Sequence, residues 1–261
     1  AISAAVVAVV LFTPQWLAPL VPSSWEREMG DALVGDFGGR FCATPKGSEA
    51  LSKMVNALDK DASDLQVEVA NIDMVNAVAL PGGKVILFQG LIDSARSPDE
   101  VAGVLAHEIG HVRERHVMQS LLRQLGLSIV LGGADGAGGS LFNGALSSSY
   151  SRDAEREADA HSIKAMSEGG VSPVATAGFF RRLSKIDGSE NAKGNAARIT
   201  GYMSSHPLSS ERKKAYENSL IKGKKYTPSL TATEWKSLQS MCGDDPDVES
   251  GFGFDFGKDD S

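Results

Sequence analysis

The sequence predicts an α+β domain in which helix outweighs strand. Its 261 residues are 42% hydrophobic and 23% charged, close to the average of soluble globular domains, which excludes a collagen-like, coiled-coil or largely disordered chain. Apolar side chains recur at helical spacing in several long segments, whereas the strand-like segments are short and lie around one turn. We therefore expect a single, mostly helical domain with a small sheet.

Charge and cysteine content narrow the range of functions. Lys and Arg number 26 against 33 Asp and Glu, a net charge of −7, which argues against nucleic acid as a partner because phosphate binding needs clustered cations. Two cysteines, Cys42 and Cys242, are too few for a disulfide scaffold or a cysteine-based zinc module. A metal site in this chain must therefore be built from its five histidines and its carboxylates.

The first 25 residues carry no charge and begin with a dense apolar run, residues 1–12. This run is shorter than the ~20 apolar residues that span a bilayer. Two interpretations stay open: the end of a membrane anchor, or an apolar helix packed on the domain. The first is favoured because prolines and tryptophans follow, as where a chain leaves a membrane through an aromatic interface. They are Pro14, Trp16, Pro19, Pro22 and Trp25.

We expect three parts in the chain. Residues 1–25 are the remnant of a membrane anchor, residues 26–243 form one folded domain, and residues 244–261 are a flexible acidic tail. The tail repeats Gly and Asp around Phe252, Phe254 and Phe256, a composition that favours disorder.

Strand signals lie in the first half of the domain. Residues 48–58 place apolar side chains at helical spacing, and residues 65–72 alternate as a strand does. A turn at residues 81–83 precedes a second apolar strand, Lys84–Phe88. The simplest product is a small antiparallel sheet.

Helix signals dominate the rest. A long helix is predicted from residue 98 to about residue 125, with Ser97 as N-cap, Pro98 at the first helical position and Glu100 closing a capping box. Residues 132–144 are too rich in glycine for helix or strand and predict a mobile loop. Further helices are predicted over residues 151–166, after Ser172-Pro173 and after a capping box of Thr231 and Glu234.

The segment with the clearest chemistry is His107-Glu108-Ile109-Gly110-His111, inside the long helix. Residues four apart lie about 40° apart around a helix, so His107 and His111 can bind one tetrahedral ion from the same side. Glu108 lies beside that face, where its carboxylate can take a proton from water instead of binding the metal. His116 is half a turn out of phase with His107, and His161 has no partner pattern, so neither is expected in the site.

Two imidazoles do not hold zinc, and a third protein ligand is needed. Glu155 and Asp159 are the best candidates, because they lie four residues apart on one helix face while Glu157 points elsewhere. A solvated helix face that carries local ion pairs is the alternative interpretation of these acids.

The sequence resembles the gluzincin metallopeptidases, which include the CAAX prenyl endopeptidase, HtpX and BepA, on the motifs HEIGH, YSRDAEREAD and SSHPLSSER. NAVALPGG and RERH extend the resemblance, which runs from about Asn76 to Arg212. It implies a zincin-type catalytic domain built on the His-Glu-x-x-His helix. By position it also implies Glu155 as the third zinc ligand and Asp159 as a group that orients a ligand histidine.

The same resemblance assigns roles to His206 and Arg212. The family's His-Pro loop places a histidine near the metal, either in the open ligand position or against the substrate carbonyl, and this histidine matches His206. Arg212 matches the family's following arginine, and one of the two is expected to stabilise the oxyanion. Where the family usually has glycine three residues after Asp159, this chain has Ser162.

The resemblance implies a zinc metalloendopeptidase that hydrolyses unfolded or misassembled envelope proteins, with a water activated by Glu108 as nucleophile. A strand can align an extended substrate through its backbone, and the residues expected to do so are Lys84, Val85, Ile86, Leu87 and Phe88. The alternative is a zinc-stabilised periplasmic chaperone or assembly factor with little proteolytic activity, in which His206 is a fourth ligand.

The N-terminus and the family together imply a bacterial cell-envelope protein on the periplasmic face, anchored to the membrane. In that oxidising space Cys42 and Cys242 can pair, which would contribute ~4 to 5 kcal/mol by chain-entropy arguments. Two buried free thiols are the alternative. The expected partners are unfolded or extended polypeptides and the membrane, and no nucleic acid.

Overall fold

The computed structural model describes residues 14–35, 37–130, 150–187, 202, 205–207 and 210–249. Three predicted features lie outside these residues: the apolar run 1–12, the glycine-rich loop 132–144 and the three phenylalanines of the tail. Among the described residues, no helix combines the length and the apolar character that crossing a bilayer requires.

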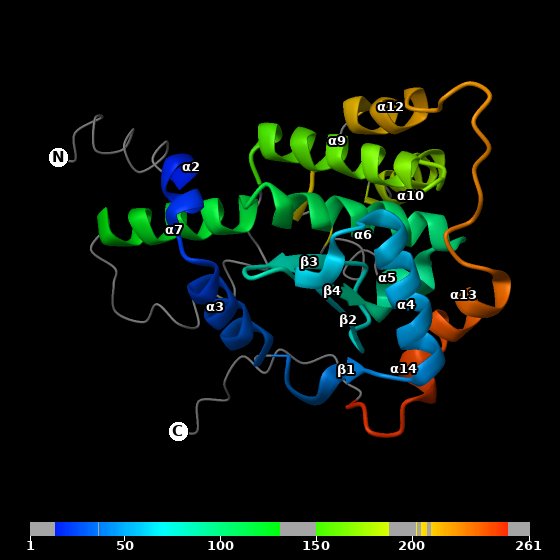
Figure 1. The fold of residues 1–261 in the computed structure, drawn as a ribbon, viewed down its shortest axis with the longest axis horizontal. Helices are drawn as coiled ribbons and strands as arrows, with labels where there is room; N and C mark the ends of the chain where they lie inside the picture. The colour runs from blue at the N-terminus through cyan, green and yellow to red at the C-terminus, as the bar shows by residue number, and fades with distance from the viewer. Residues whose placement is uncertain are drawn as a thin grey trace.

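The domain is layered around helix α6 (Pro98–Arg113). A four-stranded sheet lies on one side of α6, and α9 (Arg152–Glu168) and α10 (Val174–Asp187) lie on the other, with α12 (Ser210–Asn218) beyond them (Figure 1). Every residue of α6 from 101 to 111 is buried. A helix buried on all sides is normally apolar all round, so polar side chains inside α6 call for a specific reason.

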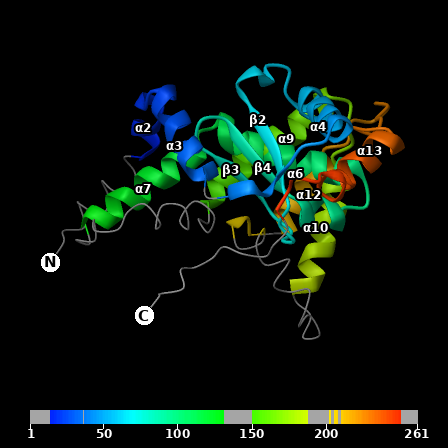
Figure 2. The same ribbon diagram turned by 90° about the horizontal axis from the view of Figure 1, so that it is seen from below.

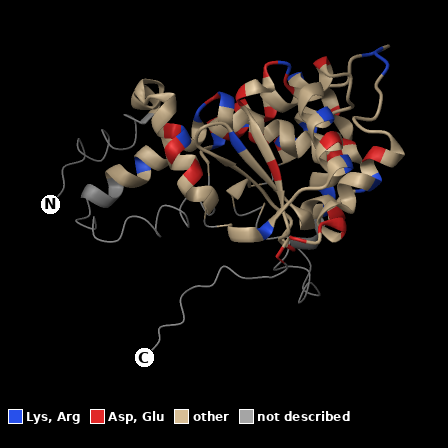
Figure 3. Cartoon of the chain, turned by 60° about the horizontal axis from the view of Figure 1, so that its bottom comes forward, with Lys and Arg blue, Asp and Glu red and all other residues tan. Residues whose placement is uncertain are grey.

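The remaining helices flank these layers. On one side of the sheet lie α2 (Pro14–Leu17), η1 (Ala18–Leu20) and α3 (Ser23–Gly35), and on the other α4 (Pro45–Leu58), α13 (Ala232–Gln239) and α14 (Met241–Asp244) (Figure 2). Three short helices complete the set: η2 (Gly38–Arg40), η3 (Ala62–Asp64) and α5 (Gln89–Ser94). Acidic and basic residues are interspersed along the described helices, strands and loops (Figure 3).

The sheet is mixed, which corrects the predicted antiparallel arrangement. Its strand order is β1-β2-β4-β3, with β2 parallel to β4 and the other two pairs antiparallel. The strands are β1 (Phe41–Cys42), β2 (Gln66–Ala70), β3 (Ala77–Leu80) and β4 (Lys84–Phe88). The turn at residues 81–83 joins β3 and β4 as a hairpin, and Gly82 and Gly83 adopt the positive φ that it requires. Because β4 takes the place beside β2, β3 lies at the edge of the sheet.

The predicted helix from residue 98 to about residue 125 is two helices, α6 and α7 (His116–Val130), that run end to end (Figure 1). Arg115 lies between them with a φ of 54°, the left-handed region in which helices end. Its guanidinium donates to Glu26 over 2.6 Å and to the carbonyl of Val21 over 2.9 Å. Periodicity could not show this break, because these contacts come from the N-terminal segment.

Small residues let the helices cross α6 closely. A Cβ on Gly103 would overlap Thr176 of α10, and a Cβ on Gly110 would lie 3.0 Å from the Cα of Ala158 in α9. Ser162 donates from its hydroxyl to the carbonyl of Gly103 over 2.9 Å. The serine that stands in place of the family's usual glycine therefore contributes a hydrogen bond between α9 and α6.

One of the two predicted capping boxes is wrong. Ser97 is the N-cap of α6, but its side chain makes no capping hydrogen bond, and Glu100 pairs with Arg182 of α10. The capping box of Thr231 and Glu234 is confirmed at the start of α13.

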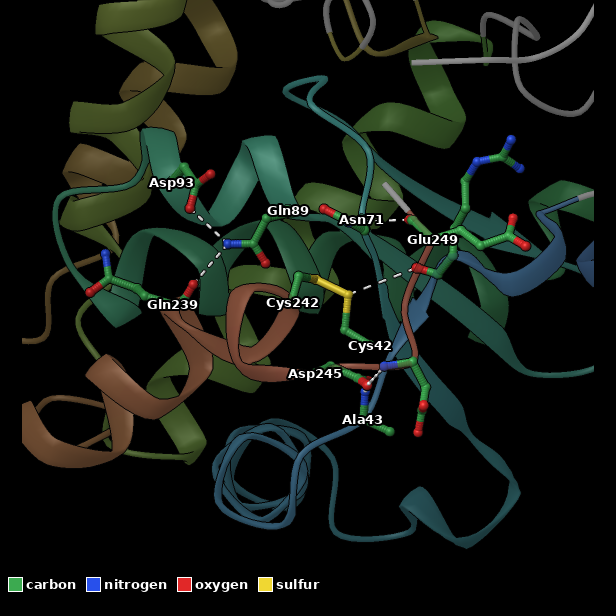
Figure 4. Close-up of a disulfide and its surroundings, with 11 residues drawn as sticks. Cys42, Ala43, Asn71, Gln89, Asp93, Gln239, Cys242, Asp245 and Glu249 are labelled. Atoms are coloured by element: carbon green, nitrogen blue, oxygen red, sulfur yellow. Dashed lines mark hydrogen bonds between the residues drawn. A yellow bond between two sulfur atoms is a disulfide. The ribbon is translucent and has the colours of Figure 1, made fainter. Parts of the chain in front are cut away.

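Cys42 and Cys242 form a disulfide, which decides between the bridge and two free thiols (Figure 4). The bond joins β1 to α14, and both cysteines are buried. Beside it, the backbone N–H of Ala43 donates to the carboxylate of Asp245 over 2.7 Å. This part of the predicted tail is therefore held against β1.

Candidate active site

Helices α6 and α9 bring three potential ligands to one point. His107 and His111 are fully buried, and their Nε2 atoms lie 3.1 Å apart, as the spacing of four residues in a helix predicts. Helix α9 crosses α6 at Gly110 and brings Glu155 to the pair. The Glu155 carboxylate oxygens lie 3.6 Å from Nε2 of His107 and 3.4 Å from Nε2 of His111.

His206 lies in the same cluster. Its backbone N–H donates to the carbonyl of Tyr202 over 2.8 Å, which fixes the start of the His-Pro segment. Its Nδ1 lies 2.9 Å from Oε1 of Glu155 and 3.3 Å from Nε2 of His107. One ligand atom from each of the four side chains lies within 4.8 Å of every other, and all four residues are buried.

The cluster has the dimensions of a tetrahedral zinc site. With bonds of about 2.0 to 2.1 Å, tetrahedral nitrogen and oxygen ligands lie about 3.4 Å apart. For every pair of these side chains except His111 and His206, the closest separation lies between 2.9 and 3.6 Å. In addition, three buried carboxylate oxygens lack a well-formed hydrogen bond among the described residues. They are Glu155 Oε2, which has an ion pair with Nη1 of Arg212 at 2.7 Å, and both oxygens of Glu108, of which Oε1 lies 3.4 Å from Nε2 of His206. Buried carboxylates with few hydrogen bonds are costly, and a cation at the centre of the cluster would offset that cost for Glu155.

The protonation states suit metal binding. Burial lowers the pKa of His111 well below its ordinary value, so its imidazole is neutral, the form that ligates metals. Burial raises the pKa of Glu155, but His206 and His111 outweigh burial, and the net shift keeps this carboxylate ionised.

Glu108 lies against the cluster without being part of it. The side chain is fully buried, and burial raises its pKa to about 7. His206 is a close charged neighbour, with Nε2 3.4 Å from Oε1 of Glu108. A carboxyl group that titrates near neutrality can both accept and release a proton, as a general base of hydrolysis must.

Comparison with known proteins agrees with this geometry. The sequence matches peptidase family M48 over residues 46–219, a segment that contains the whole cluster. The chain belongs to peptidase family M48. It is a zinc metalloendopeptidase of that family, similar to its HtpX-like and BepA-like members.

Three relatives illustrate this M48 membership. The mitochondrial metalloendopeptidase OMA1 of Arabidopsis thaliana is 32% identical over 157 residues, 57% of this chain and 30% of the relative. The metalloprotease YcaL of Escherichia coli (strain K12) is 30% identical over 192 residues, 69% of this chain and 72% of the relative. The beta-barrel assembly-enhancing protease of Yersinia pestis is 30% identical over 181 residues, 60% of this chain and 37% of the relative. The chain thus spans most of YcaL but well under half of the other two.

Asp159 lies behind His107 in this M48 domain. Its Oδ1 is 3.0 Å from Nδ1 of His107, the contact that an orienting carboxylate requires. Burial raises the pKa of Asp159, but its hydrogen bonds to His107 and Arg212 outweigh burial and lower the pKa to about 2. Asp159 is therefore ionised, and its predicted role is compatible with its position.

Arg212 has a different place from the one predicted. Its Nε and Nη2 donate to Asp159 over 2.7 and 2.8 Å, and Nη1 forms an ion pair with Glu155 at 2.7 Å and donates to the carbonyl of Pro207. With these N–H groups engaged, a direct role in stabilising an oxyanion is not supported. Arg212 instead holds the two carboxylates of the site.

His116 corrects the analysis of helical phase. Its Nδ1 lies 3.1 Å from Nδ1 of His111, and its Nε2 lies 2.9 Å from Oε2 of Glu157. His116 does not reach the ligand cluster itself, as predicted, but it does belong to the site. A continuous helix would carry it to the far side, and the break at Arg115 brings it back to His111.

Two tyrosines also belong to the M48 site. Tyr150 stacks on His111 with ring centroids 3.9 Å apart, and Tyr202 stacks on His206 at 4.8 Å. Tyr150 is the first residue of the motif YSRDAEREAD, and its closeness to Glu155 in the sequence is a signal that could have placed it at the site. Nothing in the sequence around Tyr202 marks it.

The strand predicted to bind substrate is in the wrong position. β4, residues Lys84–Phe88, is paired along both edges, with β2 and with β3, so its backbone cannot accept another strand. The strand beside α6 with an unpaired edge in the sheet is β3. The N–H of Phe88 donates to the carbonyl of Asn76, and the alternation of an antiparallel pair then turns the backbone groups of Ala77 and Ala79 outward.

Proposed function

We propose that this M48 metalloendopeptidase cuts unfolded or misassembled envelope proteins, with His107, His111 and Glu155 as zinc ligands and Glu108 as general base. The observation that carries this proposal is the buried ligand cluster beside the buried carboxylate of Glu108. Three nitrogen and oxygen ligands with an acid–base group next to them form the donor set of a hydrolytic zinc site.

Zinc in this cluster would polarise the attacking water and the scissile carbonyl. Glu108 accepts the proton that the water loses as its oxygen bonds to the carbonyl carbon. When the C–N bond breaks, Glu108 returns that proton to the leaving amine, a transfer suited to a pKa of about 7. Asp159 keeps the ring of His107 in place with Nε2 toward the cluster.

The edge of β3 is the proposed guide for substrate. An extended peptide can pair with the outward backbone groups of Ala77 and Ala79, beside the helix that carries Glu108. Backbone pairing tolerates many side chains. That tolerance suits an enzyme that removes unfolded chains of varied sequence.

Three features support a location in the bacterial envelope. The disulfide between Cys42 and Cys242 is typical of an oxidising compartment. A relative is named for the assembly of beta-barrels. Trp16, Leu20 and Trp25 are exposed near the N-terminal side of the domain, which suits association with a membrane interface.

Replacing Glu108 tests the proposed chemistry. Glu108→Gln should reduce cleavage of an unfolded protein by roughly 100- to 10,000-fold while zinc content stays at wild-type level, because the ligands are untouched. The matched control is Glu114→Gln, which changes an exposed glutamate at the end of α6 and should leave cleavage unchanged. Full cleavage by a zinc-loaded Glu108→Gln variant would falsify the assigned role.

The position of His206 favours a second candidate, a chaperone with a closed metal site. Four protein ligands characterise structural zinc, and His206 lies close enough to be the fourth. If His206 restrains a peptidase, His206→Ala should cleave unfolded protein faster than the wild type. If both proteins suppress aggregation and neither cuts any unfolded substrate, the chaperone is the better description.

A further inference from the structure

The two ligand histidines of α6 are each held from behind, but by different groups. The ring nitrogen of His107 that faces away from the cluster contacts the carboxylate of Asp159. The corresponding nitrogen of His111 contacts a second imidazole, that of His116, at 3.1 Å. His116 is only 3% exposed, and its other nitrogen contacts Glu157 at 2.9 Å.

We propose that His116 and Glu157 are positioning residues that hold His111 for metal binding, an inference that rests on the proposed zinc site. Nε2 of His111 faces His107 and Glu155, so its lone pair is directed at the cluster. The proton of a neutral His111 ring is then on Nδ1 and is donated to Nδ1 of His116. His116 in turn carries its proton on Nε2 and donates it to Glu157.

This arrangement leaves each imidazole one tautomer. The carboxylate at the outer end requires a donor on Nε2 of His116, and in a neutral His116 ring Nδ1 is then an acceptor. That acceptor requires a donor on Nδ1 of His111, which frees Nε2 of His111 for the metal. Glu157 and His116 thus select the metal-binding tautomer of His111, as Asp159 does directly for His107.

The backbone is shaped to make this contact. His116 is the first residue of α7, and it reaches His111 because Arg115 adopts a left-handed conformation between the helices. That conformation is unfavourable for a residue with a side chain, and the contacts of Arg115 with Glu26 and Val21 offset the cost. The strained backbone at Arg115 places His116 beside the proposed ligand His111, which is consistent with a functional reason for the break between the helices.

The test measures zinc affinity by competition with a chromogenic chelator, not activity. His116→Phe keeps the ring but removes the acceptor, and we expect zinc to bind about 10- to 100-fold more weakly. His116→Gln offers an amide oxygen to the Nδ1–H of His111 and should recover part of this loss. Glu157→Gln should have a smaller effect than His116→Phe, and Asp153→Asn, an exposed acid on the same helix, none.

Two further measurements separate positioning from simple packing. Because Glu157 acts through His116, Glu157→Gln should add nothing to the zinc affinity of His116→Phe. The visible absorption spectrum of the cobalt-substituted protein should change in His116→Phe and not in Asp153→Asn. Thermal unfolding of the metal-free proteins shows whether each variant is folded. If His116→Phe does not fold, Glu157→Gln provides the test, because Glu157 has an exposed carboxylate.

The outcomes distinguish this inference from the proposed function. Tight zinc binding by the wild type, with unchanged affinity and cobalt spectrum in both His116→Phe and Glu157→Gln, overturns the positioning role alone. Failure of the wild type to bind zinc overturns the site and the positioning role together. Weakened binding in His116→Phe, partial recovery in His116→Gln and no additivity with Glu157→Gln support it.

Discussion

Buried charged groups at the site stabilise one another through a single arginine. Arg212 is 5% exposed, and its guanidinium contacts the carboxylates of Asp159 and Glu155 within 2.8 Å. Phe180 lies under the guanidinium, 5.1 Å from ring centroid to Cζ, and limits access of water from that side. Replacing one charged side chain of such a group leaves the others buried without an opposite charge. The cost of that exceeds the net stabilisation that the ion pairs provide.

We therefore expect Arg212→Met to lower the free energy of unfolding of the metal-free protein by about 3 to 5 kcal/mol. Urea denaturation at pH 6 is the measurement. Arg156→Met is the control, because Arg156 lies on the exposed face of α9 and should change stability by less than about 0.5 kcal/mol. A loss for Arg212→Met no larger than that of the control would contradict a central role for this arginine.

The difference in unfolding free energy between wild type and Arg212→Met should depend on pH because of Asp159. Its folded-state pKa of about 2 lies below the ordinary value, so its contribution to stability is complete above about pH 4 and is lost as the pH falls toward 2. Without Arg212 the folded-state pKa rises and part of this contribution disappears, because His107 and Arg212 both lower the pKa of Asp159. The stability difference between wild type and Arg212→Met should therefore be largest near neutral pH and shrink below pH 4. A difference that grows in acid would contradict the assignment.

At the scale of elements, the site depends on how closely helices cross α6. Gly103 and Gly110 lie seven residues apart on α6, where α10 and α9 approach it. Helix α9 is also tied to α6 by the hydrogen bond from the Ser162 hydroxyl to the carbonyl of Gly103. A shift of α9 along α6 would move Glu155 away from the histidines, so these small residues set the distances within the cluster.

Gly103→Ala should destabilise the domain by about 1 to 3 kcal/mol, because the added methyl group overlaps Thr176 in a close-packed core. Gly178→Ala on α10 is the control. A Cβ there would lie 3.9 Å from Nη2 of Arg181, an ordinary contact, and alanine should stabilise that helix by roughly 0.5 to 1 kcal/mol. Opposite signs for the two substitutions in urea denaturation would confirm the packing argument, and equal signs would not.

Element boundaries show where reasoning from sequence stops. The capped helix with His107 and His111 could be predicted, because spacing within a helix is local geometry. The break at Arg115 could not, because it depends on contacts with Glu26 and Val21. The strand order of the sheet could not be predicted for the same reason. Local sequence does not show whether β3 or β4 of the hairpin pairs with β2.

On the scale of the whole molecule, one disulfide links the two ends of the described domain. Cys42 in β1 and Cys242 in α14 are 200 residues apart, so the bond closes a loop that includes the entire site (Figure 4). The hydrogen bond from Ala43 to Asp245 lies beside it. Through this link the C-terminal helices stay attached to β1, which lies at the opposite edge of the sheet from β3.

We expect the Cys42→Ala/Cys242→Ala double variant to lose up to about 5 kcal/mol of unfolding free energy, as chain entropy predicts for a loop of this length. Urea denaturation with and without reductant measures the loss. Reductant should destabilise the wild type and leave the double variant unchanged. Two titratable thiols in the denatured, unreduced wild type would show that the bridge does not form.

The sequence by itself determined the chemistry of this protein: the two histidines and the base on one helix, the acidic motif that follows, and the family that combines them. These features are local, because a helix sets the relation between residues three or four apart. Tertiary structure decided what the remaining groups do. It made Arg212 a holder of carboxylates, returned His116 to His111, placed β3 at the edge of the sheet and paired the cysteines. Each of these depends on contacts between residues far apart in the chain, and no periodicity records such contacts.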